Sequence, residues 1–334
     1  MTQSIVFDSI EQMAELLETH AEKKGVLITT QSIFALYGNA VLASCPLKLI
    51  PVFIPDGEEA KTLEWASHCW EKMIAAGLDR QSFVVALGGG SVGDLAGFVA
   101  ACYMRGLALI HLPTTLLSMV DSSVGGKNSI NIFSHKNLIG TFAKPYLTFI
   151  DYNFLKTLPA RELSSGIAEI IKYGAIADLK LFEELENNIA QLLKNPLDYV
   201  PHVIPQCCQI KKNITEQDLE DKLGMRALLN FGHTFGHAIE SLTGFCHYLH
   251  GEAVAIGMSC ACYLSYQLGL CSDRVFQRMD QLIHMAGLPT ALPFVEEDRL
   301  IAAMKKDKKS LSGHLNFILI EQIGEVISVS DVSE

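Results

Sequence analysis

Residues 83–94 read FVVALGGGSVGD, and this stretch decides the fold. An apolar, β-branched run leads directly into glycines at the GxGxxG spacing, and an apolar helical pattern follows. Glycine permits positive φ and lets the backbone approach a pyrophosphate at a helix N-terminus. The stretch therefore predicts a strand, a dinucleotide-binding turn and a helix.

A GxGxxG match alone is a weak signal, and a purely structural tight turn is the alternative. In an ordinary Rossmann unit an acid about 20 residues further on holds the ribose. No such acid is present in residues 110–115. We therefore expect dinucleotide binding in a variant geometry.

Outward from this turn, short β-branched runs alternate with helical patterns, as in a parallel sheet covered by helices. Apolar residues recur at helical spacing in Ile10–Ala21 and Leu63–Ala76. The first half is thus predicted to be an α/β, Rossmann-like nucleotide-binding domain over residues 1–159. Its expected strands are Val26–Thr30, Leu47–Ile54, Phe83–Leu87, Ala108–Leu112 and Leu147–Asp151.

After residues 158–160 the pattern changes to long helical stretches, which predicts a mainly α-helical domain over residues 160–334. Leu315–Val329 is the exception, because its β-branched residues around Gly324 predict a small strand pair. The uncharged stretch Ala253–Ser272 is long enough to raise the question of a membrane span, but its serines and glycines favour a buried core helix.

Composition limits the class of protein. With 334 residues, 49% of them apolar, the chain can bury a large core, and its net charge of -11 disfavours nucleic acid as a partner. An anionic ligand must therefore meet a local cationic pocket. The start of the chain has no basic leader, and the nine scattered cysteines match no metal or redox spacing, so we expect a cytoplasmic protein with reduced thiols.

A second glycine cluster, DSSVGGKNS at residues 121–129, resembles a phosphate loop only superficially. Asp121 stands where the first glycine is required, and Asn128 replaces the Ser or Thr that would hold magnesium. A nucleoside triphosphatase is therefore excluded. We expect instead a flexible loop that presents Lys127, with Lys136 and Asn137 close behind, to a phosphate or carboxylate.

The stretch NFGHTFGHAIE, residues 230–240, indicates a metal or proton-transfer site. His233 and His237 are four residues apart and Glu240 follows, so the three share one helix face. His247 and His250 come soon after. Spacing leaves two ligand sets open: the local set of His233, His237 and Glu240, or His233 with a more distant histidine and an acid from another helix.

One such acid lies on the helix predicted over Pro159–Asp178. Its apolar stripe leaves Glu169 and Lys172 as neighbours off the stripe. They are either an ordinary surface ion pair or a metal-binding acid beside a substrate-binding lysine.

Taken together, these segments resemble the 3-dehydroquinate synthase family over about residues 24–326. The blocks that carry the resemblance are PDGEEAK at 55–61, LGGGSVGDLAGF from 87, YMRG from 103, PTTLLSMVDSSVGGKNSIN from 113, HKNLIGTF from 135, FLKTLPARELSSGIAEIIKYG from 154, LLNFGHTFGHAIE from 228 and HGEAVAIGM from 250.

The resemblance implies NAD and a Zn²⁺ or Co²⁺ ion as cofactors, and it implies Glu169, His233 and His250 as the metal ligands. The implied NAD contacts are Asp56, Glu58, Lys61, Gly90, Ser91, Val92, Gly93, Asp94, Thr114, Thr115, Lys127, Lys136, Phe154, Leu155, Lys156 and Thr157.

The resemblance also implies residues that contact substrate or transfer protons. They are Arg105, Asp121, Lys127, Asn137, Lys172, Lys211, Arg226, Asn230, His237 and Lys308. Two departures stand out: Lys212 is an alternative to Lys211, because residues 216–224 are one residue longer than usual, and Asn128 replaces a common Thr. The arginine at the Arg105 position is expected to reach a partner's site, which implies a homodimer.

The implied reaction converts 3-deoxy-D-arabino-heptulosonate 7-phosphate to 3-dehydroquinate and phosphate in the shikimate pathway, which leads to aromatic amino acids. It proceeds by transient NAD oxidation, phosphate elimination, reduction and intramolecular aldol closure, with no net redox product. The rivals are another sugar-phosphate cyclase, against which Arg226 and Lys211 argue because they suit a carboxylate, and a metal-dependent polyol dehydrogenase.

Overall fold

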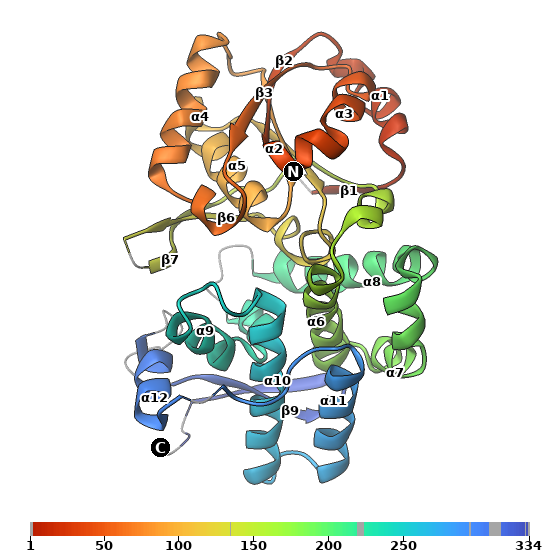
Figure 1. Ribbon diagram of the computed structural model, residues 1–334, viewed down its shortest axis with the longest axis vertical. Helices are drawn as coiled ribbons and strands as arrows, with labels where there is room; N and C mark the ends of the chain where they lie inside the picture. The colour runs from red at the N-terminus through yellow and green to blue at the C-terminus, as the bar shows by residue number, and fades with distance from the viewer. Residues whose placement is uncertain are drawn as a thin grey trace. The chain divides into compact units, whose positions relative to one another are not determined.

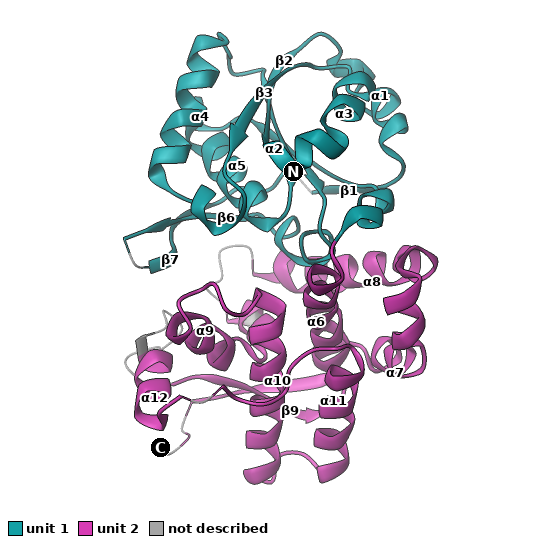
Figure 2. Cartoon of the chain, in the orientation of Figure 1, with its two compact units in different colours: residues 1–158 teal, residues 159–334 magenta. Residues whose placement is uncertain are grey.

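The protein is described here by a computed structural model, shown in Figure 1, that describes residues 3–133, 135–218, 224–293, 295–306, 315–330 and 332. The chain divides into two compact units, residues 1–158 and residues 159–334 (Figure 2).

Unit 1 contains a six-stranded parallel sheet in the order β1-β8-β5-β4-β2-β3. The five strands predicted from the sequence are confirmed, and β1 is an additional strand that the sequence reading did not include. The strands are β1 (Ser4–Phe7), β2 (Lys24–Thr30), β3 (Lys48–Ile54), β4 (Phe83–Gly88), β5 (Ala108–Pro113) and β8 (Leu147–Ile150).

Helical segments flank this sheet (Figure 1). The α-helices are α1 (Met13–Leu16), α2 (Gln31–Ile33), α3 (Asn39–Ser44), α4 (Leu63–Ala75) and α5 (Gly90–Cys102). The 3₁₀ and π segments are η1 (Ile10–Gln12), η2 (Glu18–His20), η3 (Phe34–Gly38), η4 (Gly57–Ala60), η5 (Tyr103–Arg105), η6 (Ser118–Ser122) and η7 (Tyr152–Thr157).

The helical pattern of Ile10–Ala21 folds as three short helical segments, η1, α1 and η2, and not as one continuous helix. Ile10, Met13 and Leu17 are nevertheless buried. The apolar spacing therefore identified the buried residues correctly, but it did not distinguish three short helical segments from one continuous helix.

The glycine-rich turn lies where the order of strand addition switches from one side of β2 to the other. From β2 the chain moves outward to β3, then returns to β4 on the other side of β2. Every residue of β4 is buried, as expected for a central parallel strand covered on both faces. Ligands of such sheets bind outside the carboxyl ends of the strands at this switch point.

The strands β6 (Lys127–Ile132) and β7 (His135–Phe142) form an antiparallel hairpin, so the expectation of a flexible loop at Lys127 is wrong. Asn128 is buried, and its amide donates to the carbonyls of Gly126 and Ala143. Gly97 of α5 permits this close packing, since a Cβ there would lie 1.8 Å from the Asn128 Oδ1. Tertiary packing, which the glycine-rich composition concealed, orders the segment.

Unit 2 is mainly helical, as predicted. Its helices are α6 (Ala160–Ala177), α7 (Leu179–Lys194), α8 (Pro196–Gln217), η8 (Met225–Asn230), α9 (His233–Leu242), α10 (His250–Gln267), α11 (Asp273–Met285) and α12 (Glu297–Lys306). The predicted terminal strand pair is confirmed as β9 (Phe317–Gln322) antiparallel to β10 (Glu325–Val329).

Helix α10 is the centre of unit 2 and contacts α6, α9, α11 and β9. Most of its residues between Gly251 and Cys262 are buried, which explains why its sequence carries so little charge. In the part of the chain that the structure describes, no helix combines the length and apolarity required to cross a bilayer.

Candidate functional site

In unit 1, the residues expected to contact NAD gather at the carboxyl ends of the parallel strands. Asp56, Glu58 and Lys61 follow β3, and Thr114 and Thr115 follow β5. Residues 90–94 form the first turns of α5 after β4, and residues 154–157 lie in η7 after β8. Strands far apart in the sequence thus deliver these groups to one edge of the sheet.

Close approach, rather than positive φ, explains the glycines of the turn at residues 88–93. Gly88, Gly89, Gly90 and Gly93 are not among the glycines with positive φ. A Cβ on Gly88 would lie 2.6 Å from Val92 Cγ2, one on Gly89 3.1 Å from Thr115 Cγ2, and one on Gly93 3.2 Å from His111 Cε1. The turn is therefore packed tightly between β4, β5 and the start of α5.

Lys61 connects this turn to the β6–β7 hairpin. Its buried ammonium donates to Asp94 Oδ2 at 2.7 Å and to Asn137 Oδ1 at 2.6 Å. Glu58 accepts from Asn131 at 2.8 Å and from Ser91 at 3.4 Å. Lys136 lies half-buried in β7, Lys127 is exposed at the start of β6, and Asp121 is half-buried in η6.

Arg105 lies on an exposed and strained backbone. Met104 has φ 48° and Arg105 has φ 71°, and both residues are exposed. Left-handed backbone in consecutive non-glycine residues is costly and occurs mostly at functional sites.

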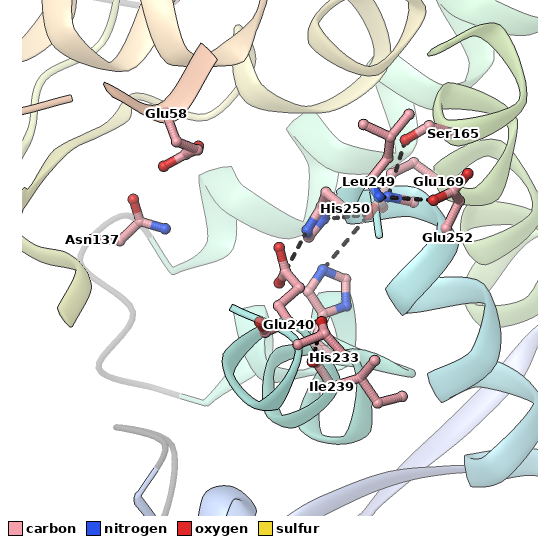
Figure 3. Close-up of polar contacts among 12 residues, drawn as sticks. Glu58, Asn137, Ser165, Glu169, His233, Ile239, Glu240, Leu249, His250 and Glu252 are labelled. Carbon is pink, nitrogen blue, oxygen red and sulfur yellow. Dashed lines mark hydrogen bonds and ion pairs between the residues drawn. The ribbon is translucent and has the colours of Figure 1, made fainter. Parts of the chain in front are cut away.

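In unit 2, Glu169, His233 and His250 are brought together, with one possible ligand atom from each residue within 4.8 Å of the others. They come from the middle of α6, the first residue of α9 and the first residue of α10. Glu169 Oε1 lies 3.2 Å from His250 Nε2 and 3.6 Å from His233 Nε2 (Figure 3). Two imidazoles and a carboxylate suit zinc or cobalt and leave further coordination positions for substrate.

The local set of His233, His237 and Glu240 is not the group that converges. Glu240 Oε2 lies on the opposite side of the His250 ring, 3.7 Å from its Nδ1. The His237 ring is 5.4 Å from that of His233 and 6.5 Å from that of His250. His237 is therefore placed beside the cluster, where it can contact a bound substrate.

Groups behind the histidines orient their rings. His233 Nδ1 donates to the Phe231 carbonyl at 3.1 Å, which turns Nε2 toward Glu169.

Burial disfavours a charged His250, but its contacts with Glu169 and Glu240 outweigh burial and raise its pKa to about 10. The cluster thus attracts positive charge. Sequence reasoning missed the Phe231 contact, because a backbone carbonyl leaves no signal in residue type.

Glu169 and Lys172 form a buried pair, so the interpretation as a surface ion pair is wrong. Their side chains are 0% and 2% exposed, and the Lys172 ammonium contacts Glu169 Oε2 directly. Burying two charges is costly unless each is well partnered, which favours a functional reason for keeping them.

The remaining predicted residues of unit 2 lie on η8 and α8. Arg226 is buried and Asn230 half-buried on η8. Lys211 is buried on α8 beside Cys207 and Cys208, whereas Lys212 is half-buried, so the structure favours Lys211 as the inward-facing lysine. Lys308 lies outside the described residues.

Comparison with known proteins gives matches along most of the chain. Residues 51–165 match the family "3-dehydroquinate synthase N-terminal", and residues 166–310 match "3-dehydroquinate synthase C-terminal". The 3-dehydroquinate synthase of Desulforamulus reducens is 48% identical over 323 residues, covering 96% of this chain and 90% of the relative. That of a Thermoanaerobacter species is 45% identical over 331 residues, covering 97% and 93%.

Solved structures share the fold. The 2-epi-5-epi-valiolone synthase of Streptomyces hygroscopicus, with NAD⁺ and Zn²⁺ bound, has a TM-score of 0.91 and 30% identity over 100% of this chain and 94% of that chain. A 2-deoxy-scyllo-inosose synthase, complexed with carbaglucose-6-phosphate, NAD⁺ and Co²⁺, has a TM-score of 0.83 and 26% identity over 98% and 93%.

Proposed function

We infer the function from the premise that this chain belongs to the 3-dehydroquinate synthase family. It is an NAD- and divalent-metal-dependent lyase that converts 3-deoxy-D-arabino-heptulosonate 7-phosphate to 3-dehydroquinate and phosphate. The observation that carries the assignment to residues is the convergence of Glu169, His233 and His250.

We propose that these three residues hold the metal. The fit rests on the donor set and on its orientation: each Nε2 faces Glu169, and the far nitrogens face Phe231 O and Glu240. A Zn²⁺ or Co²⁺ ion there supplies Lewis acidity toward hydroxyl and carbonyl oxygens of the substrate.

We propose that residues 1–159 bind NAD and that residues 160–334 bind the metal. The loops at the carboxyl ends of β3, β4, β5 and β8 would hold the dinucleotide, with its pyrophosphate at the N-terminus of α5. NAD supplies a reversible hydride acceptor, which permits elimination next to a ketone without net oxidation.

The chain's own cationic and polar side chains bind and orient the substrate in this proposal. Lys172 and Lys211 hold the hydroxyl oxygens that react, while Asp121 and His237 orient or shuttle protons. The anionic ends are bound by Lys127, Asn137, Arg226, Asn230 and Lys308. Buried Lys172, Lys211 and Arg226 provide the local positive charge that an acidic chain needs for a phosphorylated sugar acid.

We further propose a homodimer located in the cytoplasm. Phe133, Leu138 and Phe142 of the hairpin are 97%, 46% and 56% exposed, which suits burial against a second copy. Arg105 would enter the neighbouring site. All nine cysteines are free thiols, as expected in a reducing compartment.

The decisive experiment supplies the purified chain with the heptulosonate phosphate, zinc and a substoichiometric amount of NAD. The proposal expects many turnovers of phosphate release and dehydroquinate formation for each NAD, with no accumulated NADH. Steady NADH production from glycerol-like substrates would support a polyol dehydrogenase, and turnover of sedoheptulose 7-phosphate instead would support a different cyclase. An inert mixture with the heptulosonate phosphate contradicts the proposal.

A further inference from the structure

His250 is the first residue of α10, so its position depends on how the start of that helix is held. The first turn of a helix has unsatisfied N–H groups and tends to fray. Glu252 partly prevents this, since its Oε2 accepts from the Leu249 N–H at 2.8 Å. Leu249 has no side-chain oxygen to complete the cap, so other groups must hold the start of α10.

A stripe on α6 supplies those groups. Arg161, Ser165 and Glu169 are spaced four residues apart and therefore lie along one face of the helix. Each contacts one of the first three residues of α10, in reverse order: Glu252, Gly251 and His250. Figure 3 shows Ser165 and Glu169 beside the Leu249–Glu252 turn. We name these six residues the α6–α10 latch.

Arg161 contacts both Glu252 and the turn before α10. Its Nε donates to Glu252 Oε1 at 2.6 Å and its Nη2 to Glu252 Oε2 at 2.7 Å, a bidentate pair. The same Nη2 donates to the His247 carbonyl at 2.9 Å, which ties down the turn before α10. Arg161 is 59% exposed, so solvent screens the pair and its contribution to overall stability should be small.

Ser165 and Gly251 set the spacing between the two helices. The Ser165 hydroxyl accepts from the Gly251 N–H at 3.0 Å. A Cβ on Gly251 would lie 1.9 Å from the Ser165 carbonyl oxygen, so only glycine permits this approach. Four residues further along α6, Glu169 meets His250 at 3.2 Å.

We propose that Arg161 and Glu252 are positioning residues for the metal site: they hold the start of α10 on α6, so that His250 and Glu169 stay at ligand distance from each other. The inference rests on the proposed ligand set. It adds two residues that touch neither metal nor substrate.

The test measures zinc alone, by competition with a chromophoric chelator, on the full-length protein. Arg161→Met and Glu252→Gln should each weaken zinc binding by about tenfold or more, the range found when groups behind a metal ligand are removed. The double variant should bind zinc no more weakly than Arg161→Met, because that change already removes the Arg161–Glu252 contact that Glu252→Gln weakens.

A matched control pair exists on other helices. Arg278 of α11 makes an equally bidentate pair with Glu186 of α7, at 2.8 and 2.7 Å. Arg278→Met should lower the melting temperature of the metal-free protein at least as much as Arg161→Met does, yet leave the zinc dissociation constant within about twofold. Zinc affinity that follows the melting temperature across all variants would overturn the proposal, as would unchanged affinity in Arg161→Met or additive losses in the double variant.

Glu169→Ala separates failure of this inference from failure of the proposed function. Loss of zinc in Glu169→Ala with normal zinc in Arg161→Met and Glu252→Gln contradicts the latch alone. Normal zinc in Glu169→Ala contradicts the ligand set itself. Should Arg161→Met fold poorly, Glu252→Gln answers the same question, because its amide retains an acceptor for Leu249.

Discussion

A buried pair of opposite charges lies at the proposed metal site of unit 2. Lys172 and Glu169 are nearly inaccessible to water and contact each other. Each charge lowers the cost of burying the other. A divalent ion bound to Glu169 would itself neutralise that carboxylate, so the metal site does not require the positive charge of Lys172. We therefore expect Lys172 to bind the substrate rather than to support metal binding.

Replacing Lys172 with methionine tests this division of roles. Lys172→Met preserves most of the side-chain volume, so we expect a folded protein whose turnover falls by roughly a hundredfold through loss of one charge-assisted contact to substrate. Zinc affinity should not fall, because a neighbouring positive charge has been removed. Zinc content and kcat, measured on the same preparation, check both expectations; wild-type turnover would remove the lysine from the mechanism.

His111 on β5 makes the stability of the protein depend on pH. It is buried beneath Gly93, and burial lowers its pKa from 6.5 to about 4. Below about pH 6.5 the unfolded chain takes up a proton that the folded chain refuses, so stability falls as pH falls and the loss is complete near pH 4.

His111→Leu should remove this dependence. From about pH 7.5 to about pH 5, the wild type should lose about 2 kcal/mol of unfolding free energy through this residue, and the variant should not. Denaturant unfolding at several pH values measures the slope. The same change at exposed His202 is the control and should keep the wild-type slope; a variant at position 111 with that slope would contradict the assignment.

At the scale of elements, helix α5 and strand β6 pack closely where Gly97 meets Asn128. Gly97→Ala would drive a methyl group into the Asn128 side chain. Overpacking of this kind costs about 1–3 kcal/mol, and it should displace the hairpin that carries Lys127 and Asn137. Equilibrium unfolding measures the cost.

Asn128→Ala should partly rescue Gly97→Ala, since it removes the colliding atoms Oδ1 and Cγ. The double variant should lose less unfolding free energy than the two single variants lose in total. Simple additivity would show that the two residues do not compete for the same space.

The regular elements of unit 1 were predictable, and the irregular ones were not. Strand β4 and helix α5 follow from an apolar run and a glycine turn that are adjacent in the sequence. The β6–β7 hairpin does not, because its order depends on Asn128 packing against Gly97, a contact between residues 31 positions apart (128 minus 97). Local composition at residues 121–129 resembles a loop, and only the tertiary contact orders it.

For the metal cluster, the chemistry was predictable from spacing but the geometry was not. The sequence placed His233 and His237 on one face, and both do lie in α9. What selects His250 over His237 is the crossing of α10 on α6, set by Gly251 and Ser165. Spacing within one helix contains no information about that crossing, so the ligand set had to come from the family resemblance.

At the scale of the whole molecule, the proposed homodimer predicts complementation between two inactive chains. Arg105→Ala and Lys172→Met should each be inactive. Arg105→Ala removes the side chain proposed to enter the partner's site, and Lys172→Met removes a side chain of the chain's own site. Mixed dimers would then contain one intact site in two. After unfolding and refolding together, equal amounts should recover about a quarter of wild-type activity.

Recovery that stays at the level of the single variants would contradict a shared site. A control mixture of Lys172→Met with His233→Ala should stay inactive, because both changes lie in the same chain's site and no mixed dimer assembles an intact one. Sedimentation of each mixture confirms that dimers are present.

Ser4–Phe7 is an edge strand of the six-stranded sheet, and within the described residues Leu147–Ile150 is the one strand with which it pairs. During synthesis on a ribosome this segment emerges early and must wait for about 140 more residues before its neighbour exists. For that interval β1 lacks the strand with which it pairs, so nascent chains stalled before residue 147 should be captured by chaperones and proteases more readily than chains that extend past residue 150.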